Sequence, residues 1–358
     1  MLARLQKITT LGGLLLAALW AWAFARAGHA GWAMAGALLL LAGYALVLAL
    51  EFTLLRVAHG DDDATPRAGA AQLLRAWWGE VRAAPTVFCW RQPFFSQRFP
   101  DYFPAVTSAA LGRRRGVLLV HGFVCNRGLW NRWLRRLRQA GVPVLAVNLE
   151  PVFGSIDDYA PHIEAAVRRL EQHTGLPPVV VAHSMGGLAL RRWWAGSADS
   201  RVHHAITIGT PHHGTWLARF ALTPNGREMR RDSRWLQSLA AREPAGRNAR
   251  FTCFYSHCDN IVFPPATATL PGRTTGIWTV WRMCTWRIGR SLGPSCSAGS
   301  RPSRSCLGRR AHVDGAAPGA HHRSITTAAS FEVRASMFQA CLSLGNHLLS
   351  NVLQRSPT

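Results

Sequence analysis

Residues 178–194 constrain the fold more tightly than any other part of the sequence. Val179-Val180-Val181 is apolar at every position, as expected of a strand that a parallel sheet buries on both faces. The strand leads directly into His183-Ser184-Met185-Gly186-Gly187, and a helical segment follows. Small residues flank the serine, so a tight turn can lift its hydroxyl above the sheet. We therefore predict Ser184 as a nucleophile; the alternative is an ordinary serine at the start of a helix.

Strands and helices alternate throughout residues 116–272. Short apolar runs separated by segments of helical periodicity predict a mostly parallel sheet flanked by helices. The predicted strands cover residues 117–120, 142–148, 178–181 and 250–256, and the predicted helices cover residues 130–140, 156–173 and 188–194. An α/β fold with a single core is therefore predicted for residues 116–272.

The predicted turn after the first strand supplies a partner for Ser184. His121-Gly122-Phe123 directly follows the run 117–120. Attack on an ester places negative charge on the carbonyl oxygen, and preorganised backbone N–H groups stabilise that charge. We predict that the N–H groups of Phe123 and Met185 form this oxyanion hole. The residues that shape the two turns are His121, Gly122, His183 and Gly186.

Three segments together resemble the bacterial lipase and esterase branch of the α/β-hydrolases. They are Val120-His121-Gly122-Phe123, Ala182-His183-Ser184-Met185-Gly186-Gly187 and Ile208-Gly209-Thr210-Pro211-His212-His213-Gly214-Thr215. The resemblance implies hydrolysis of carboxylic esters and needs no cofactor. It also implies a triad acid at Asp259 and a cap over the pocket at residues 214–249. A turn-forming role is the alternative for Asp259.

The adjacent His212 and His213 raise the alternative of a metal site. Neighbouring side chains of an extended chain point to opposite sides, and no acidic residue lies nearby in the sequence. We therefore predict a structural role for these two residues and no metal ion.

The catalytic base of the expected triad has no obvious position. It should come from a loop soon after Asp259, but no histidine occurs between His257 and His312. Residues 273–358 lack regular periodicity, and we predict an atypical tail that is out of frame or disordered. A one-base shift at Arg273 can encode Gly-Val-Ala-His, which resembles the closing Gly-x-x-His segment of the family. If the tail is genuine, the remaining candidates are His312, His321, His322 and His347.

Two long apolar runs precede the predicted hydrolase core. Residues 8–24 and 32–50 each have the length that a helix needs to cross about 30 Å of hydrocarbon. We predict a transmembrane hairpin over residues 1–56; a cleaved signal peptide is the alternative, although the second run argues against it. Basic residues before the first run and after the second favour the cytoplasmic side for both ends. The catalytic domain is then expected on the cytoplasmic face of a bacterial inner membrane.

Residues 57–115 are predicted to connect the hairpin to the core. This region is rich in aromatic side chains, which we expect to pack on the hydrolase, with the membrane interface as the alternative. They are Trp77, Trp78, Phe88, Trp90, Phe94 and Phe95.

The formal charge of +23 raises the question of nucleic-acid binding. The excess charge is spread along the chain instead of forming one stripe, and among its basic residues only Lys7 is a lysine. We therefore expect no nucleic-acid partner. The eight cysteines contain no CxxC pair, so they do not indicate a metal site.

These patterns predict a membrane-anchored serine carboxylesterase or lipase that acts on small-molecule or lipid esters. Ser184 attacks the carbonyl, Asp259 orients a histidine, and loss of the histidine segment impairs catalysis. Two alternatives stay open. One is a non-catalytic binding or scaffold protein with a hydrolase fold, and the other is an acyl transferase or amidase with the same triad. The sequence does not determine the ester or the oligomeric state.

Overall fold

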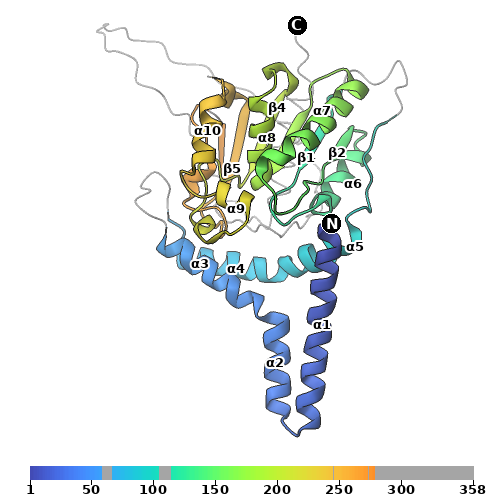
Figure 1. The fold of residues 1–358 in the computed structure, drawn as a ribbon, viewed down its shortest axis with the longest axis vertical. Coiled ribbons are helices and arrows are strands. Elements are labelled where there is room, and N and C mark those ends of the chain that lie inside the picture. Colours follow the sequence, from blue (N-terminus) through green and yellow to red (C-terminus); the bar gives the residue numbers. More distant parts are fainter. Residues whose placement is uncertain (59–66, 105–113, 245, 273, 279–358) are drawn as a thin grey trace, which may run out of the picture.

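The computed structural model describes residues 1–58, 67–104, 114–244, 246–272 and 274–278. The centre of this described part is a parallel sheet of six strands in the order β2-β1-β3-β4-β5-β6 (Figure 1). The strands are β1 (Val117–Val120), β2 (Val144–Ala146), β3 (Val179–His183), β4 (His204–Ile208), β5 (Phe251–Ser256) and β6 (Thr274–Trp278). This arrangement confirms the predicted α/β fold.

Helices precede, connect and flank the strands. The α-helices are α1 (Leu2–Arg26), α2 (Ala30–Ala42), α3 (Tyr44–Val57), α4 (Ala70–Ala84), α5 (Gln92–Phe95), α6 (Asn131–Gln139), α7 (Ala160–Thr174), α8 (Met185–Ala195), α9 (Pro224–Glu228) and α10 (Arg234–Arg242). A π-helix, η1 (Pro85–Arg91), joins α4 to α5. Short 3-10 helices are η2 (Arg127–Trp130), η3 (Ile156–Tyr159), η4 (Asp199–Arg201), η5 (Trp216–Phe220), η6 (Arg247–Arg250) and η7 (Pro265–Ala268).

The register of the strands brings the expected functional loops to one edge of the sheet. Val120 pairs with Ala182, and His183 pairs with Ile208, so β1, β3 and β4 end side by side. After β1 the chain runs outward to β2 and then crosses to β3 on the other side of β1. Such a reversal leaves a crevice at the carboxyl ends of the two neighbouring strands, where open α/β sheets bind ligands.

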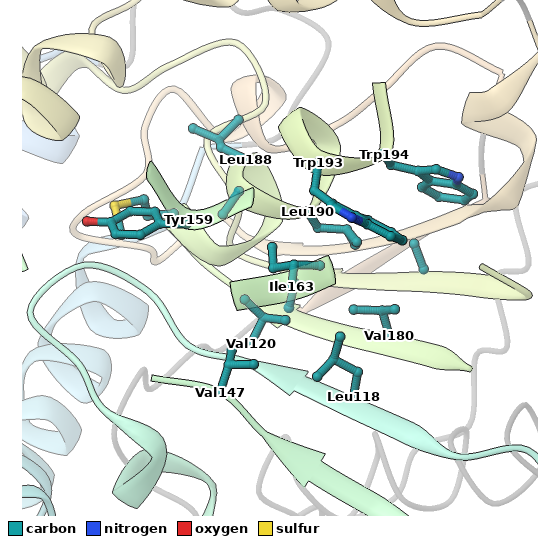
Figure 2. Close-up of a cluster of buried hydrophobic side chains, with 14 of the residues drawn as sticks. Leu118, Val120, Val147, Tyr159, Ile163, Val180, Leu188, Leu190, Trp193 and Trp194 are labelled. Atoms are coloured by element: carbon teal, nitrogen blue, oxygen red, sulfur yellow. The ribbon is translucent and has the colours of Figure 1, made fainter. Parts of the chain in front are cut away.

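Alternate residues of the strands enter two separate hydrophobic cores. Leu118, Val120 and Val180 face α7 and α8 and pack in one cluster with Trp194 (Figure 2). Val117 and Leu119 belong to the opposite cluster, which includes α6 and the N-terminal helices. Because helices cover both faces, these strands are apolar throughout, as their sequences indicate.

Two antiparallel helices, α1 and α2, project from the body of the molecule (Figure 1). Helix α1 is long and apolar enough to cross a membrane, and little of its apolar stretch is buried. The second predicted span, residues 32–50, is not one straight helix. The helix is interrupted at Gly43, and the axes of α2 and α3 differ in direction by 53°. Among the described residues a second span is therefore present only if this bent pair is counted as one.

Part of the region that we predicted as a connection, together with α3 from the predicted hairpin, forms a helical layer that packs on the sheet. Helices α3 and α4 and the π-helix η1 contribute buried apolar side chains to the α6 face of the sheet; they are Phe52, Leu55, Leu73, Ala76, Ala83 and Val87. Of the aromatic residues expected to pack on the hydrolase, Trp77 and Phe88 do so in part. Trp78 and Trp90 are instead 54% and 58% exposed.

The sheet extends beyond residue 272, where we expected the regular fold to end. Residues Thr274–Trp278 form β6, which pairs in parallel with β5. A strand that we expected to be missing is therefore present. The rest of the predicted tail lies outside the described residues, as do the four candidate bases His312, His321, His322 and His347.

Candidate active site

Ser184 occupies a strained turn between β3 and α8. Its backbone has φ 52° and ψ −130°, a left-handed conformation that is uncommon for a residue with a side chain. The Ser184 N–H donates to the Ile208 carbonyl at 2.9 Å, which ties the turn to β4. The residues on either side are buried, whereas the serine itself is half-buried. Within the described part of the chain its hydroxyl makes no hydrogen bond.

Gly186 is required by the close approach of two chain segments. A Cβ atom at this position would lie 2.4 Å from the carbonyl oxygen of His121 and 2.9 Å from that of Val120. Both neighbours are backbone atoms, so they cannot rotate away as a side chain could. The absence of a side chain at Gly186 therefore lets the first turn of α8 pack against the end of β1.

The loop after β1 lies directly against the serine. A Cβ atom at Gly122 would lie 2.7 Å from the Cβ atom of Ser184. Neither the Phe123 N–H nor the Met185 N–H donates to an acceptor in the described residues. Met185 is also the first residue of α8, and a helix N-terminus favours negative charge. The structure therefore places the loop of Gly122 and the first turn of α8 beside Ser184.

His121 is buried, and its hydrogen bonds hold this loop in place. Its Nε2 accepts the Leu149 N–H at 3.0 Å, so Nδ1 carries the proton and donates to the Gly122 carbonyl at 2.9 Å. Burial lowers the pKa of His121 to about 4. Burial, and then the nearby His121, lower the pKa of His183 to about 4 as well. Both imidazoles are therefore neutral at pH 7, and both nitrogens of His121 are occupied.

Asp259 lies in the loop after β5, on the same edge of the sheet as Ser184. Its Oδ1 accepts the N–H groups of Ile261 at 3.0 Å and Val262 at 2.9 Å. These bonds match the turn-forming role that we gave as the alternative. The other oxygen accepts no hydrogen bond in the described residues, so it is available to an imidazole. Burial raises the pKa of Asp259 to about 6, against the opposing effect of these backbone donors.

No histidine follows Asp259 within the described residues, which end at Trp278.

His212 and His213, in the loop after β4, lie on opposite sides of the chain, one buried and the other exposed. The Nε2 of His212 lies 3.0 Å from Thr207 Oγ1, and its carbonyl accepts from Arg191 at 2.9 Å. These contacts agree with the structural role that we predicted for His212.

The predicted cap segment, residues 214–249, is anchored on both sides of the site. Arg191 of α8 forms a buried ion pair of 2.6 Å with Glu243, just after α10. The side chain of Asn225, in α9, donates to the Val152 carbonyl at 2.9 Å in the loop after β2. Phe123 and Phe153 make an edge contact with ring centroids 6.0 Å apart.

Five polar residues near the site were missed by sequence reasoning. Gln92 accepts the Asn126 N–H at 2.7 Å, and Asn126 also reaches Gln6 of α1 at 3.4 Å. Glu51 of α3 accepts from the Asn260 side chain at 2.6 Å. These contacts join the N-terminal helices to the loops after β1 and β5. The signal was the presence of Gln6 and Glu51 in or beside otherwise apolar runs, where an unpaired polar group is costly.

Residues 117–322 match the family model described as the alpha/beta hydrolase family. This match covers more than half of the chain. The chain is an α/β hydrolase. The family match continues past Arg273, and the prediction of an altered reading frame stays a prediction.

Several solved structures are similar to this hydrolase at low identity. The mature lipase BlEst2 of Bacillus licheniformis has 17% identity and a TM-score of 0.44, over 51% of this chain and 91% of that one. Lipase B of Aspergillus fumigatus has 22% identity and a TM-score of 0.39, over 46% and 42%. The monoacylglycerol lipase of Paleococcus ferrophilus has 15% identity and a TM-score of 0.34, over 46% and 86%. No curated protein matches the sequence of this hydrolase.

Proposed function

We propose that this hydrolase cleaves carboxylic esters through an acyl-enzyme on Ser184. One observation carries the proposal. The hydroxyl of Ser184 is held on a strained turn, next to the loop of Gly122, with two N–H groups that have no described protein acceptor. This is the arrangement that acyl transfer requires.

The reaction begins when Oγ of Ser184 attacks the ester carbonyl and passes its proton to a base. The carbonyl oxygen becomes negative and accepts hydrogen bonds from the Phe123 and Met185 N–H groups. The intermediate then collapses, and the base returns the proton to the departing alcohol. A water molecule hydrolyses the acyl-enzyme by the same route and releases the acid.

The base is the unassigned part of this proposal. The free oxygen of Asp259 would orient an imidazole supplied by the segment after β6. In this reading frame that segment has no histidine before His312. A hydrolase without its base loses several orders of magnitude in rate, although oxyanion stabilisation leaves residual activity. The absence of a histidine between Asp259 and His312 is the observation that favours a second candidate, a non-catalytic binding or scaffold function.

Labelling with a fluorophosphonate probe tests the nucleophile. We expect wild type to be labelled and Ser184→Ala to be unlabelled, while Ser200→Ala, an exposed serine in η4, behaves as wild type. A panel of p-nitrophenyl esters and amides separates an esterase from an amidase. If only the protein with the shifted frame is labelled, the nucleophile and the frame prediction are both supported. If neither protein is labelled, the scaffold function is favoured.

Membrane attachment through α1 and α2 is the second part of the proposal. Helix α1 has the length and composition of a membrane span, and its side chains from Ile8 to Trp22 are largely exposed. The catalytic domain would lie on the cytoplasmic side, as the basic residues favour. Sedimentation with the membrane fraction after an alkaline carbonate wash tests attachment; release into the supernatant would contradict it.

A further inference from the structure

Exposed large apolar side chains are concentrated in the N-terminal helices of the hydrolase. In the described part of the chain, all but three of the large apolar side chains that are exposed lie before residue 95. The three exceptions are Phe153, Phe220 and Leu222. A soluble protein rarely leaves so many neighbouring apolar side chains in water. Helices α1 and α2 carry part of this surface. Helix α3, which continues the predicted hairpin, carries more of it, and α4, η1 and α5 carry a further part outside residues 1–56.

Helix α4 shows this most clearly, because both of its faces contain apolar residues. Leu73 and Ala76 face the sheet and are buried. Leu74 and Trp78, on the opposite face, are 63% and 54% exposed. An ordinary surface helix would have polar residues at these outward positions. Farther along the chain, Trp90 is also exposed.

The layer made by α3, α4, η1 and α5 lies between the hairpin and the catalytic body (Figure 1). Two hydrogen bonds join α3 to α4. Trp77 Nε1 donates to the Ala45 carbonyl at 2.9 Å, and the Tyr44 hydroxyl donates to the Val81 carbonyl at 2.6 Å. The buried face of α4 is turned to the body, so its outward face looks toward the side from which the hairpin projects.

The length of α1 sets this layer at the depth of a membrane interface. From Lys7 to Arg26 the helix rises roughly 28 Å at 1.5 Å per residue, which matches a hydrocarbon core of about 30 Å. Lys7 lies over the ring of Phe94 in α5, 5.6 Å from its centroid. At the other end, Arg26 lies 5.4 Å from the ring of Trp22. Aromatic and basic residues of this kind mark both boundaries of a bilayer.

The exposed charges of the layer are positive. In the described residues of α3, α4, η1 and α5, the exposed charged side chains are Arg56, Arg75 and Arg82. Between α3 and α4 lies an open apolar groove of about 380 Å³. Leu74 and Trp77 line this groove together with Arg56. Apolar side chains interleaved with arginine suit the headgroup region of an anionic leaflet.

We propose that α3, α4, η1 and α5 form a bilayer-contact platform that sits in the headgroup layer of an anionic leaflet. The inference rests on the proposed membrane hairpin. Through Gln92 and Glu51 the platform touches the loops that follow β1 and β5. The carboxyl edge of the sheet, with Ser184, is therefore directed toward the leaflet. This orientation makes esters of membrane lipids, delivered from the leaflet, the substrate class for the site.

Photo-crosslinking in vesicles tests the platform. The full chain is reconstituted in phosphatidylcholine with a minority of phosphatidylglycerol, using two phosphatidylcholine probes. One probe carries a diazirine beside the glycerol, and the other carries it at the end of an acyl chain. We expect the shallow probe to modify peptides from residues 70–95 and the deep probe to modify residues 8–42.

Charged substitutions on the outward face of α4 should move the platform out of the headgroup layer, while the hairpin stays inserted in the bilayer. For Leu74→Glu/Trp78→Glu we expect a loss on the order of tenfold in shallow crosslinks to residues 70–95, with unchanged deep crosslinks to α1. Ala165→Glu/Gln172→Glu, at exposed positions of α7, is the matched control and should change neither. Deep crosslinks without shallow ones in wild type would overturn the platform alone. Absence of both would overturn the platform and the membrane attachment, and neither result bears on labelling of Ser184.

Discussion

Gly186→Ala is the sharpest test of the geometry around Ser184, the proposed nucleophile. The added methyl group would lie 2.4 Å from the His121 carbonyl oxygen and 2.9 Å from that of Val120. Both distances are well below van der Waals contact, so the start of α8 must move away from β1. Overpacking of this kind costs about 1–3 kcal/mol.

For a domain of this size, each kcal/mol lowers the melting temperature by about 2–4 °C. We therefore expect Gly186→Ala to unfold several degrees below wild type when followed by near-UV circular dichroism in detergent. The same displacement moves the Met185 N–H relative to the loop of Phe123, so fluorophosphonate labelling should also slow.

Gly196→Ala is the matched control at the other end of the same helix. There the backbone has an ordinary φ of −98°. The nearest atom to an added Cβ, the Trp193 carbonyl oxygen, is 3.7 Å away. This variant should unfold at or slightly above the wild-type temperature, because alanine restricts the unfolded chain. Equal melting temperatures for the two variants would refute the close packing between α8 and β1.

Three further outcomes follow from buried polar groups. The pKa of Asp259 rises from 3.8 to about 6 on folding, so the folded protein binds this proton more tightly and its stability declines as pH rises through that interval. Asp259→Asn should therefore stabilise the protein at about pH 8 by up to about 3 kcal/mol, with no gain below about pH 4 in denaturant titrations. Arg191→Ala leaves Glu243 without its ion-pair partner and should lower the free energy of unfolding by about 3–5 kcal/mol. The double variant Arg191→Met/Glu243→Leu should recover most of this loss in the same assay. His121, with a pKa lowered to about 4, should stay neutral down to about pH 5 by imidazole ¹⁵N shifts. Because the unfolded imidazole takes up its proton near pH 6.5, stability should fall as pH drops from there toward about 4.

Each of these outcomes has a result that contradicts it. A uniform effect of Asp259→Asn at all pH values would show that the carboxyl is not desolvated. An Arg191→Ala variant as stable as Arg168→Ala, which removes an exposed pair with Glu164, would show that the buried pair makes no net contribution. Titration of His121 near pH 6.5 would contradict its burial and its bond to the Leu149 N–H.

The sequence determined the fold class and pointed to Ser184 as the proposed nucleophile. Val179-Val180-Val181 is apolar at every position, and a strand covered on both faces buries all three side chains. The small residues around Ser184 favour a tight turn, and the structure places Ser184 in such a turn, with φ 52° and ψ −130°. The proposed oxyanion donors were also named from the sequence, because they are backbone groups at fixed offsets from these motifs.

Tertiary structure alone decided how the N-terminal helices relate to the site. The apolar run 32–50 contains no proline and does not by itself show the 53° bend at Gly43, where α3 turns to pack against α4. The contacts of Gln92 with Asn126 and of Glu51 with Asn260 join residues far apart in the chain. Hydrogen bonds of this kind depend on where whole elements dock, and no local periodicity encodes that position.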